Sequence, residues 1–106
     1  MNNHRVILQP NHYYVASSNE VLTANITATS DGARGIVFIY GFDKDNNKIR
    51  LGAASVHFFN TNGGDTWVAC NSVSVGLVKG QKYRIEYETT SGTVEVNAFA
   101  VVFPNT

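Results

Sequence analysis

Cysteine is almost absent from this sequence of 106 residues, with Cys70 as its single copy. One cysteine excludes an intramolecular disulfide, so the chain is not a small secreted scaffold held together by disulfides. Its stability has to come from a hydrophobic core, and an apolar fraction of 43% with six Phe, five Tyr and one Trp is enough to build one. We therefore predict a single folded domain that spans residues 1–106.

Charged residues are also scarce, at 15% of the chain, against about 25% in an average soluble domain. Eight Lys and Arg balance eight Asp and Glu, so the formal net charge is zero. A neutral protein has no long-range attraction for the phosphates of a nucleic acid or for an anionic membrane surface. We expect no nucleic-acid partner and a surface that is polar and rich in hydroxyl groups.

Long apolar runs are missing as well. No window approaches the roughly 18 apolar residues that a membrane-spanning helix needs, and the N-terminus, MNNHRVILQ, lacks the apolar segment of a signal peptide. The sequence predicts a soluble protein without a signal peptide and without membrane insertion. We expect it in the cytoplasm, or released as part of a virion or another surface assembly.

Helical signals are almost absent, and Ala is scattered among β-branched residues. Instead, apolar and polar residues alternate, which is the pattern of a β-strand. Residues 21–29 alternate strictly, and their apolar face consists of Leu22, Ala24, Ile26 and Ala28. Residues 35–42 are a nearly continuous apolar run, which predicts a strand in the middle of a sheet that is buried on both faces.

Turn residues divide the chain at intervals of about ten residues. Residues 79–81 and 91–92 are turn signals short enough to predict two hairpins, and Gly52 predicts a bend or bulge. Eight or nine short strands without a helix predict an all-β fold of two packed antiparallel sheets, a β-sandwich of the jelly-roll type.

A calcium site is a weak possibility at residues 43–47. Asp43, Asp45 and Asn47 stand at the first, third and fifth positions of a calcium-loop pattern, where side-chain oxygens converge on a hard cation. The pattern then breaks, because Lys48 replaces its glycine and Ala54 its bidentate glutamate. A polar turn explains the same residues, so we expect no metal and keep calcium as the weaker alternative.

Catalytic signatures are lacking, since the sequence has no G-x-S-x-G, H-E-x-x-H or G-x-x-x-x-G-K-[ST] motif. The pattern around Cys70 is typical of a buried thiol that acts as a small hydrophobe. Glu86 and Glu88 share one strand face, as a glycosidase pair would, although exposed carboxylates beside Lys82 and Arg84 are the ordinary explanation. We therefore expect a protein that is not an enzyme.

Carbohydrate binding fits the composition better. A sugar offers hydroxyl groups that pair with Asn and Asp, and a C–H face that stacks on Trp or Tyr. The strongest loop signal, residues 60–65, precedes the single tryptophan, and a second aromatic cluster stands near the N-terminus. The predicted ligand-binding residues are Asn60, Asn62, Asp65, Trp67, Tyr13 and Tyr14. A core position for Trp67 and an ordinary turn at residues 60–65 stay open as the alternative.

Residues 14–24, 74–85 and 92–99 follow an order of elements that resembles the small jelly-roll tip domains of phage tail fibres and related adhesins. The Lys79-Gly80 turn, a strand, the Gly92 turn and a last strand are also similar to jelly-roll carbohydrate-binding modules. The resemblance to fibre tips implies a homotrimer, receptor or glycan binding at distal loops, and no catalysis.

From these patterns we expect a lectin-like binding module that recognises a carbohydrate or cell-surface receptor through residues 60–67, with the turn at 43–47 as their neighbour. A homo-oligomer, with a trimer favoured, would strengthen weak single-site binding. The alternative is a structural or assembly protein without a small ligand. Its last strand, residues 93–103, has apolar residues on both faces near its end and would serve oligomerisation.

Overall fold

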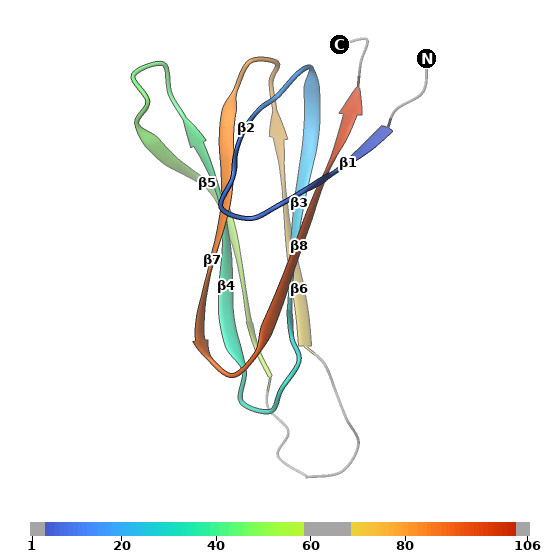
Figure 1. Ribbon diagram of the computed structural model, residues 1–106, viewed down its shortest axis with the longest axis vertical. Helices are drawn as coiled ribbons and strands as arrows, with labels where there is room; N and C mark the ends of the chain where they lie inside the picture. Colours follow the sequence, from blue (N-terminus) through green and yellow to red (C-terminus); the bar gives the residue numbers. More distant parts are fainter. Residues whose placement is uncertain (1–3, 59–68, 104–106) are drawn as a thin grey trace.

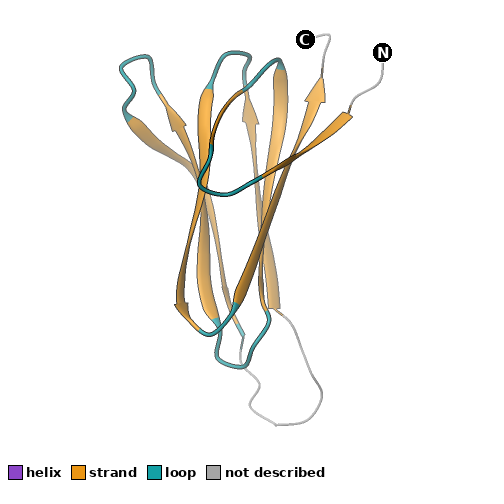
Figure 2. Ribbon diagram, viewed as in Figure 1, coloured by secondary structure: helices purple, strands orange, loops and turns teal. Residues whose placement is uncertain are grey.

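The computed structural model describes residues 4–58 and 69–103, which form eight β-strands (Figure 1). The strands are β1 (His4–Leu8), β2 (Tyr13–Val15), β3 (Asn19–Ala28), β4 (Arg34–Phe42), β5 (Lys48–His57), β6 (Ala69–Leu77), β7 (Lys82–Ser91) and β8 (Val94–Phe103). These residues contain no helix (Figure 2), and so none long and apolar enough to cross a membrane. The all-β prediction is confirmed.

The strands form two four-stranded antiparallel sheets that pack face to face. The first sheet has the order β1-β8-β3-β6 and the second has the order β2-β7-β4-β5. Consecutive strands alternate between the sheets except at β4 and β5, and this interleaved order is consistent with a jelly roll. Because β1 pairs with β8, β2 with β7, β3 with β6 and β4 with β5, the chain resembles one long hairpin rolled up around its middle turn. The predicted sandwich is confirmed.

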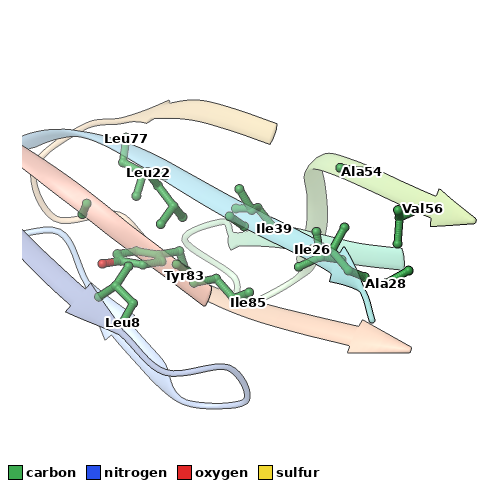
Figure 3. Close-up of a cluster of buried hydrophobic side chains, with 14 of the residues drawn as sticks. Leu8, Leu22, Ile26, Ala28, Ile39, Ala54, Val56, Leu77, Tyr83 and Ile85 are labelled. Atoms are coloured by element: carbon green, nitrogen blue, oxygen red, sulfur yellow. The ribbon is translucent and has the colours of Figure 1, made fainter. Parts of the chain in front are cut away.

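The core lies between the two sheets, and the period-two alternation of the sequence selects its residues. The apolar face of β3, predicted from Leu22 to Ala28, has no solvent exposure at any of its four positions. Ile39 of β4 and Ile85 of β7 meet it from the second sheet and are equally buried (Figure 3). Each large aliphatic side chain buried in this way stabilises the fold by roughly 1.5–3 kcal/mol.

Strand β4 is central in its sheet, as predicted, because it pairs with both β5 and β7. Burial on both faces is correct at Phe38 and wrong for the rest of the outer face. The inner face, which includes Val37 and Ile39, is buried, whereas Ile36, Tyr40 and Phe42 on the outer face are only half-buried. No third layer of described residues covers these rings. Long basic side chains of the neighbouring strands lie over them instead.

The two predicted hairpins are also wrong, although both turns are present. Gly80 and Gly92 adopt positive φ angles of 90° and 66°, which glycine reaches without strain. The strands that these turns connect do not pair with each other, since β7 lies in the second sheet and β6 and β8 lie in the first. Alternation shows which face of a strand is buried but not which strand is its partner.

The bulge predicted at Gly52 is confirmed. Ile39 lies opposite Gly52 and the next residue, Tyr40, lies opposite Arg50, so Leu51 is the extra residue on β5. Gly52 also lets β5 approach the other sheet closely, because a Cβ atom at this position would lie 2.8 Å from Cγ2 of Val73 on β6. The two edge strands β5 and β6 thus close one side of the sandwich.

Candidate functional site

Four of the six predicted ligand-binding residues, Asn60, Asn62, Asp65 and Trp67, lie outside the described residues. In the chain they come between β5 and β6, which begins at Ala69. The loop site therefore stays a prediction, and the described residues can show only what surrounds the start of β6.

The other two predicted residues, Tyr13 and Tyr14, point to opposite faces of β2. Tyr13 faces outward and is 59% exposed. Tyr14 packs against the core, where its ring stacks on Tyr83 at a centroid distance of 5.5 Å and its hydroxyl accepts the backbone N–H of Gln9 at 2.8 Å. Only Tyr13 offers a ring to a ligand, and Tyr14 connects β2 to the core.

The calcium candidates form a tight turn between β4 and β5. The Oδ1 atom of Asp43 accepts the backbone N–H groups of Asp45 and Asn47 at 2.9 and 2.8 Å, and Oδ2 accepts the side-chain amide of Asn47 at 3.2 Å. These hydrogen bonds, the one from the Asn47 backbone first, hold the pKa of Asp43 below its usual 3.8. The carboxylate therefore has a structural role in the turn, and calcium binding stays a prediction.

This turn was expected to be a neighbour of residues 60–67. It precedes Lys48 at the start of β5, whereas residues 60–67 come after His57, at the end of β5. An extended strand of ten residues separates its two ends by roughly 30 Å, and Figure 1 shows them at opposite ends of the sandwich. Residues 60–67 lie outside the described residues, so the expected proximity of the turn and the loop stays a prediction.

A polar recess of about 460 Å³ opens on the outer face of the first sheet. It is lined by Asn25, Thr27, Cys70, Asn71, Ser72 and Asn97. Strand register builds it, because Asn25 of β3 lies opposite both Asn97 of β8 and Ser72 of β6. Three adjacent strands thus bring amide and hydroxyl groups together from distant parts of the chain.

Hydrogen bonds hold the amide groups of this recess in fixed orientations. Asn25 Nδ2 donates to Asn97 Oδ1 at 2.8 Å. Asn71 lies opposite Ile26, on the core-facing side of β6, where its Nδ2 donates to the carbonyl oxygen of Ser55 on β5 at 3.1 Å and its Oδ1 accepts the backbone N–H of Ser72. Among the described residues, Asn25 Oδ1 and Asn97 Nδ2 have no protein partner. One acceptor and one donor are therefore available side by side.

Cys70 lies in this recess and is exposed, so the predicted buried thiol is wrong. Its register position explains the difference: Cys70 lies opposite Thr27, on the outer face of β3. The alternation of β6 buries the other set of side chains, which includes Leu77.

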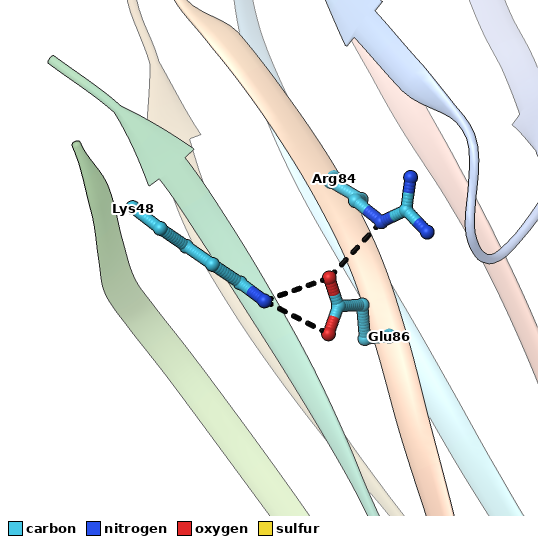
Figure 4. Close-up of polar contacts among 3 residues, drawn as sticks. All are labelled: Lys48, Arg84 and Glu86. Atoms are coloured by element: carbon cyan, nitrogen blue, oxygen red, sulfur yellow. Dashed lines mark hydrogen bonds and ion pairs between the residues drawn. The ribbon is translucent and has the colours of Figure 1, made fainter. Parts of the chain in front are cut away.

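Glu86 lies on the same face as Lys82 and Arg84, as expected, and is half-buried, whereas Glu88 is exposed. The carboxylate of Glu86 accepts hydrogen bonds from Lys48 Nζ and Arg84 Nε, both at 3.0 Å (Figure 4). The three side chains come from β5 and β7 on the outer face of the second sheet. Among the described residues there is no group of three His, Cys, Asp or Glu side chains arranged to hold a metal ion.

Comparison with known proteins adds no family to this picture, since no family model and no curated protein matches the sequence. The structure defines the class of the protein as an all-β sandwich with a jelly-roll strand order. Fold alone does not determine function, which depends on the chemistry of the surfaces.

Proposed function

We propose that the protein is a non-catalytic binding module that recognises a carbohydrate, free or as part of a cell-surface receptor. The polar recess on the outer face of the first sheet is the observation that carries this proposal. Its volume lies within the range of about 300–1,000 Å³ that is typical of small-ligand sites.

The chemistry of the recess suits a sugar. Each sugar hydroxyl both donates and accepts a hydrogen bond, and the recess offers an acceptor on Asn25, a donor on Asn97 and the hydroxyl groups of Thr27 and Ser72. The hydrogen bonds that fix the amides also reduce the entropy lost on binding. A neutral, hydroxyl-rich ligand needs no charged partner here.

The predicted loop residues lie close in sequence to a residue that lines the recess. Trp67 stands three positions before Cys70 in the sequence, and Cys70 lines the recess. A tryptophan in the segment that leads into β6 would supply the apolar face on which a sugar ring stacks. Single sites of this kind bind weakly because water competes for each hydrogen bond, and a homotrimer would raise the avidity.

The test is a glycan array with the wild-type protein, followed by the double variant Asn25→Ala/Asn97→Ala. We expect the variant to lose about tenfold or more in affinity for the saccharide that the array identifies, with a nearly unchanged thermal midpoint. Thr23→Ala/Ser74→Ala is the matched control, because these two hydroxyls form a hydrogen bond of 2.7 Å on the same strands outside the recess. The control should bind like the wild type.

Two further variants address the loop. Trp67→Ala and Asp65→Ala should each abolish saccharide binding and leave the thermal midpoint nearly unchanged. Unfolding of Trp67→Ala would instead assign the tryptophan to the core. An array without any saccharide signal from the wild-type protein would reject the proposal.

A structural role as a homo-oligomer is the second candidate, and a separate feature favours it. The apolar strip on the outer face of the first sheet consists of Ile7, Val21, Phe99, Val101 and Phe103. Ile7 is 63% exposed and none of the five is fully buried. Contiguous exposed apolar side chains of this kind often mark a protein interface, and a second copy of the chain is the partner that oligomerisation requires.

A further inference from the structure

The outer face of the second sheet, opposite the recess, carries rings and cations in an ordered array. Strand β4 contributes Phe38, Tyr40 and Phe42 to this face, and Tyr13 of β2 lies at its edge. The cations flank β4 on both sides. Phe42 lies between Lys82 of β7 and Lys48 of β5. Tyr40 lies between Arg84 of β7 and Arg50 of β5. We call this surface the cation–aromatic face.

The strand positions of the four cationic residues form the corners of a rectangle. Side chains two residues apart on one strand are separated by about 7 Å, and β5 and β7 lie two strand spacings, or about 10 Å, apart. The rings of Tyr40 and Phe42 lie between these rows. The register therefore places one row of cationic side chains on each side of β4.

Contacts with the rings hold the cations in place. Lys48 Nζ lies 4.1 Å from the ring centroid of Tyr40, and the guanidinium of Arg50 lies 4.8 Å from that of Phe38. Lys82 and Arg84 both lie 4.6 Å from the ring of Tyr13. Cation–π contacts act within about 6 Å, so long side chains that would otherwise move freely have less conformational entropy to lose when they bind an anion.

The face has a surplus of positive charge although the whole chain is neutral. Four of the eight Lys and Arg residues lie on it, and Glu86 is the carboxylate among them. Glu88 lies further along β7, opposite Ile36. Asp43 and Asp45 lie in the adjoining turn with Lys44, and the carboxylate of Asp43 is already hydrogen-bonded within that turn.

Glu86 shows how the array holds a carboxylate, since Lys48 and Arg84 bind it from two sides. Arg84 uses only Nε for this contact, and its two terminal nitrogens point away from Glu86 (Figure 4). Among the described residues Arg50 has no carboxylate partner and Lys82 binds only the side-chain oxygen of Asn46. Donors for further carboxylates are therefore present on both sides of β4.

We propose that the cation–aromatic face binds a polyuronate, a polysaccharide whose sugar units carry carboxylates. Lys82, Arg84 and Arg50 pair with successive carboxylates of the chain, as guanidinium and ammonium groups do. The exposed ring of Tyr13 contacts the C–H face of a sugar unit. This surface is separate from the recess, so the inference extends the proposed function to a second ligand class.

The structure favours a polyuronate over a nucleic acid. Single-stranded nucleic acid binds where successive bases stack on open aromatic faces. Here Lys48 and Arg50 lie over the rings of Tyr40 and Phe38, and Tyr13 is the exposed ring of the face.

The test is electrophoresis of the full chain in native gels that contain polygalacturonate, with dextran as the neutral polymer and oligo(dT) as the nucleic acid. We expect retardation by polygalacturonate that weakens as salt is added, because salt screens exposed charges, and none by dextran. Arg50→Gln/Lys82→Gln should weaken binding about tenfold or more. Neither residue pairs with Glu86, so the thermal midpoint should change little. If the double variant does not fold, the single variant Arg50→Gln tests the same loss of polygalacturonate binding.

Arg5→Gln/Lys79→Gln is the matched control, because it removes the same charge from outside the face and should stay within about twofold of the wild type. Asn25→Ala/Asn97→Ala should retain polyuronate binding, which separates this inference from the fate of the recess. Equal losses in the control and in Arg50→Gln/Lys82→Gln would overturn the inference. So would absence of retardation in the wild type, equal retardation by dextran, or tighter binding of oligo(dT).

Discussion

Among single residues, Glu20 and Tyr83 form a buried pair whose hydrogen bond connects the two sheets. Glu20 of β3 is 6% exposed and accepts the backbone N–H of Ser17 at 3.2 Å. Burial raises the pKa of Tyr83 on β7 far above its usual 10, and the negative charge of Glu20 and hydrogen bonding to it raise the pKa further. The phenol therefore stays protonated in the folded protein under alkaline conditions that ionise a free tyrosine.

This raised pKa predicts a loss of stability at alkaline pH. Above about pH 10 the tyrosine ionises in the unfolded chain but not in the folded protein, so the free energy of unfolding falls by up to about 1.4 kcal/mol per pH unit. Tyr83→Phe should remove this part of the pH dependence. Urea unfolding of both proteins between about pH 7 and about pH 11 measures it.

Below about pH 9 the phenol is protonated in both states, so the stability difference between Tyr83→Phe and the wild type should stay constant there. An identical alkaline slope in the two proteins would show that Tyr83 titrates normally in the folded state.

At the level of elements, the bulge on β5 combines a sequence signal with a packing constraint. Gly52 faces Val73 and Val75 of β6, and a Cβ atom there would lie 2.8 and 3.2 Å from their methyl groups. Gly76, on β6 itself, has nothing within 4 Å of the corresponding position. The two glycines thus form a natural pair for comparison.

Gly52→Ala should lower the free energy of unfolding by about 1–3 kcal/mol, because the extra methyl group overpacks the contact between β5 and β6. Gly76→Ala should leave stability unchanged or raise it by up to about 1 kcal/mol, since alanine reduces the entropy of the unfolded chain. Urea denaturation provides both values. Equal effects of the two changes would mean that β5 and β6 are not in close contact.

The sequence predicted elements well wherever a pattern belongs to one strand. The alternation of residues 21–29 correctly assigned the core face of β3, and Gly52 correctly marked the bulge. The apolar run in β4 led to a wrong prediction of its outer face, because Tyr40 and Phe42 are covered there by cationic side chains and not by a further layer of the protein. The side chains that cover them belong to other strands, so no local pattern could reveal this.

The candidate surfaces depended even more on register. Asn25, Asn97 and Ser72 meet only because β3 lies between β8 and β6, and the sequence alone showed Asn25 merely as part of a polar strand face. Lys48 and Arg50, like Lys82 and Arg84, are spaced two residues apart, which is the signal for a common face. The bulge at Leu51 begins one residue after Arg50, so it preserves this alignment.

For the whole molecule, the apolar strip decides between a monomer and an oligomer. If it forms the contact between copies, light scattering should show a multiple of the monomer mass, and Val101→Asn should reduce the mass to that of the monomer. Its polar amide would be buried without a partner at the contact.

Val15→Asn is the control, since Val15 is equally apolar and 63% exposed but lies on the outer face of the other sheet. The control should keep the wild-type mass. A monomeric wild-type protein at high concentration would exclude oligomerisation through this strip.

The pairing of β1 with β8 has a consequence for how the protein is made. β1 is synthesised before the other seven described strands, yet its partner in the sheet is β8, which is synthesised after them. Among the described strands only β4 and β5 are consecutive and paired. Most pairings therefore have to close long loops before their contacts form, which makes folding slow. The first sheet cannot be completed until β8 has been synthesised, and until then its exposed strand edges depend on protection from aggregation.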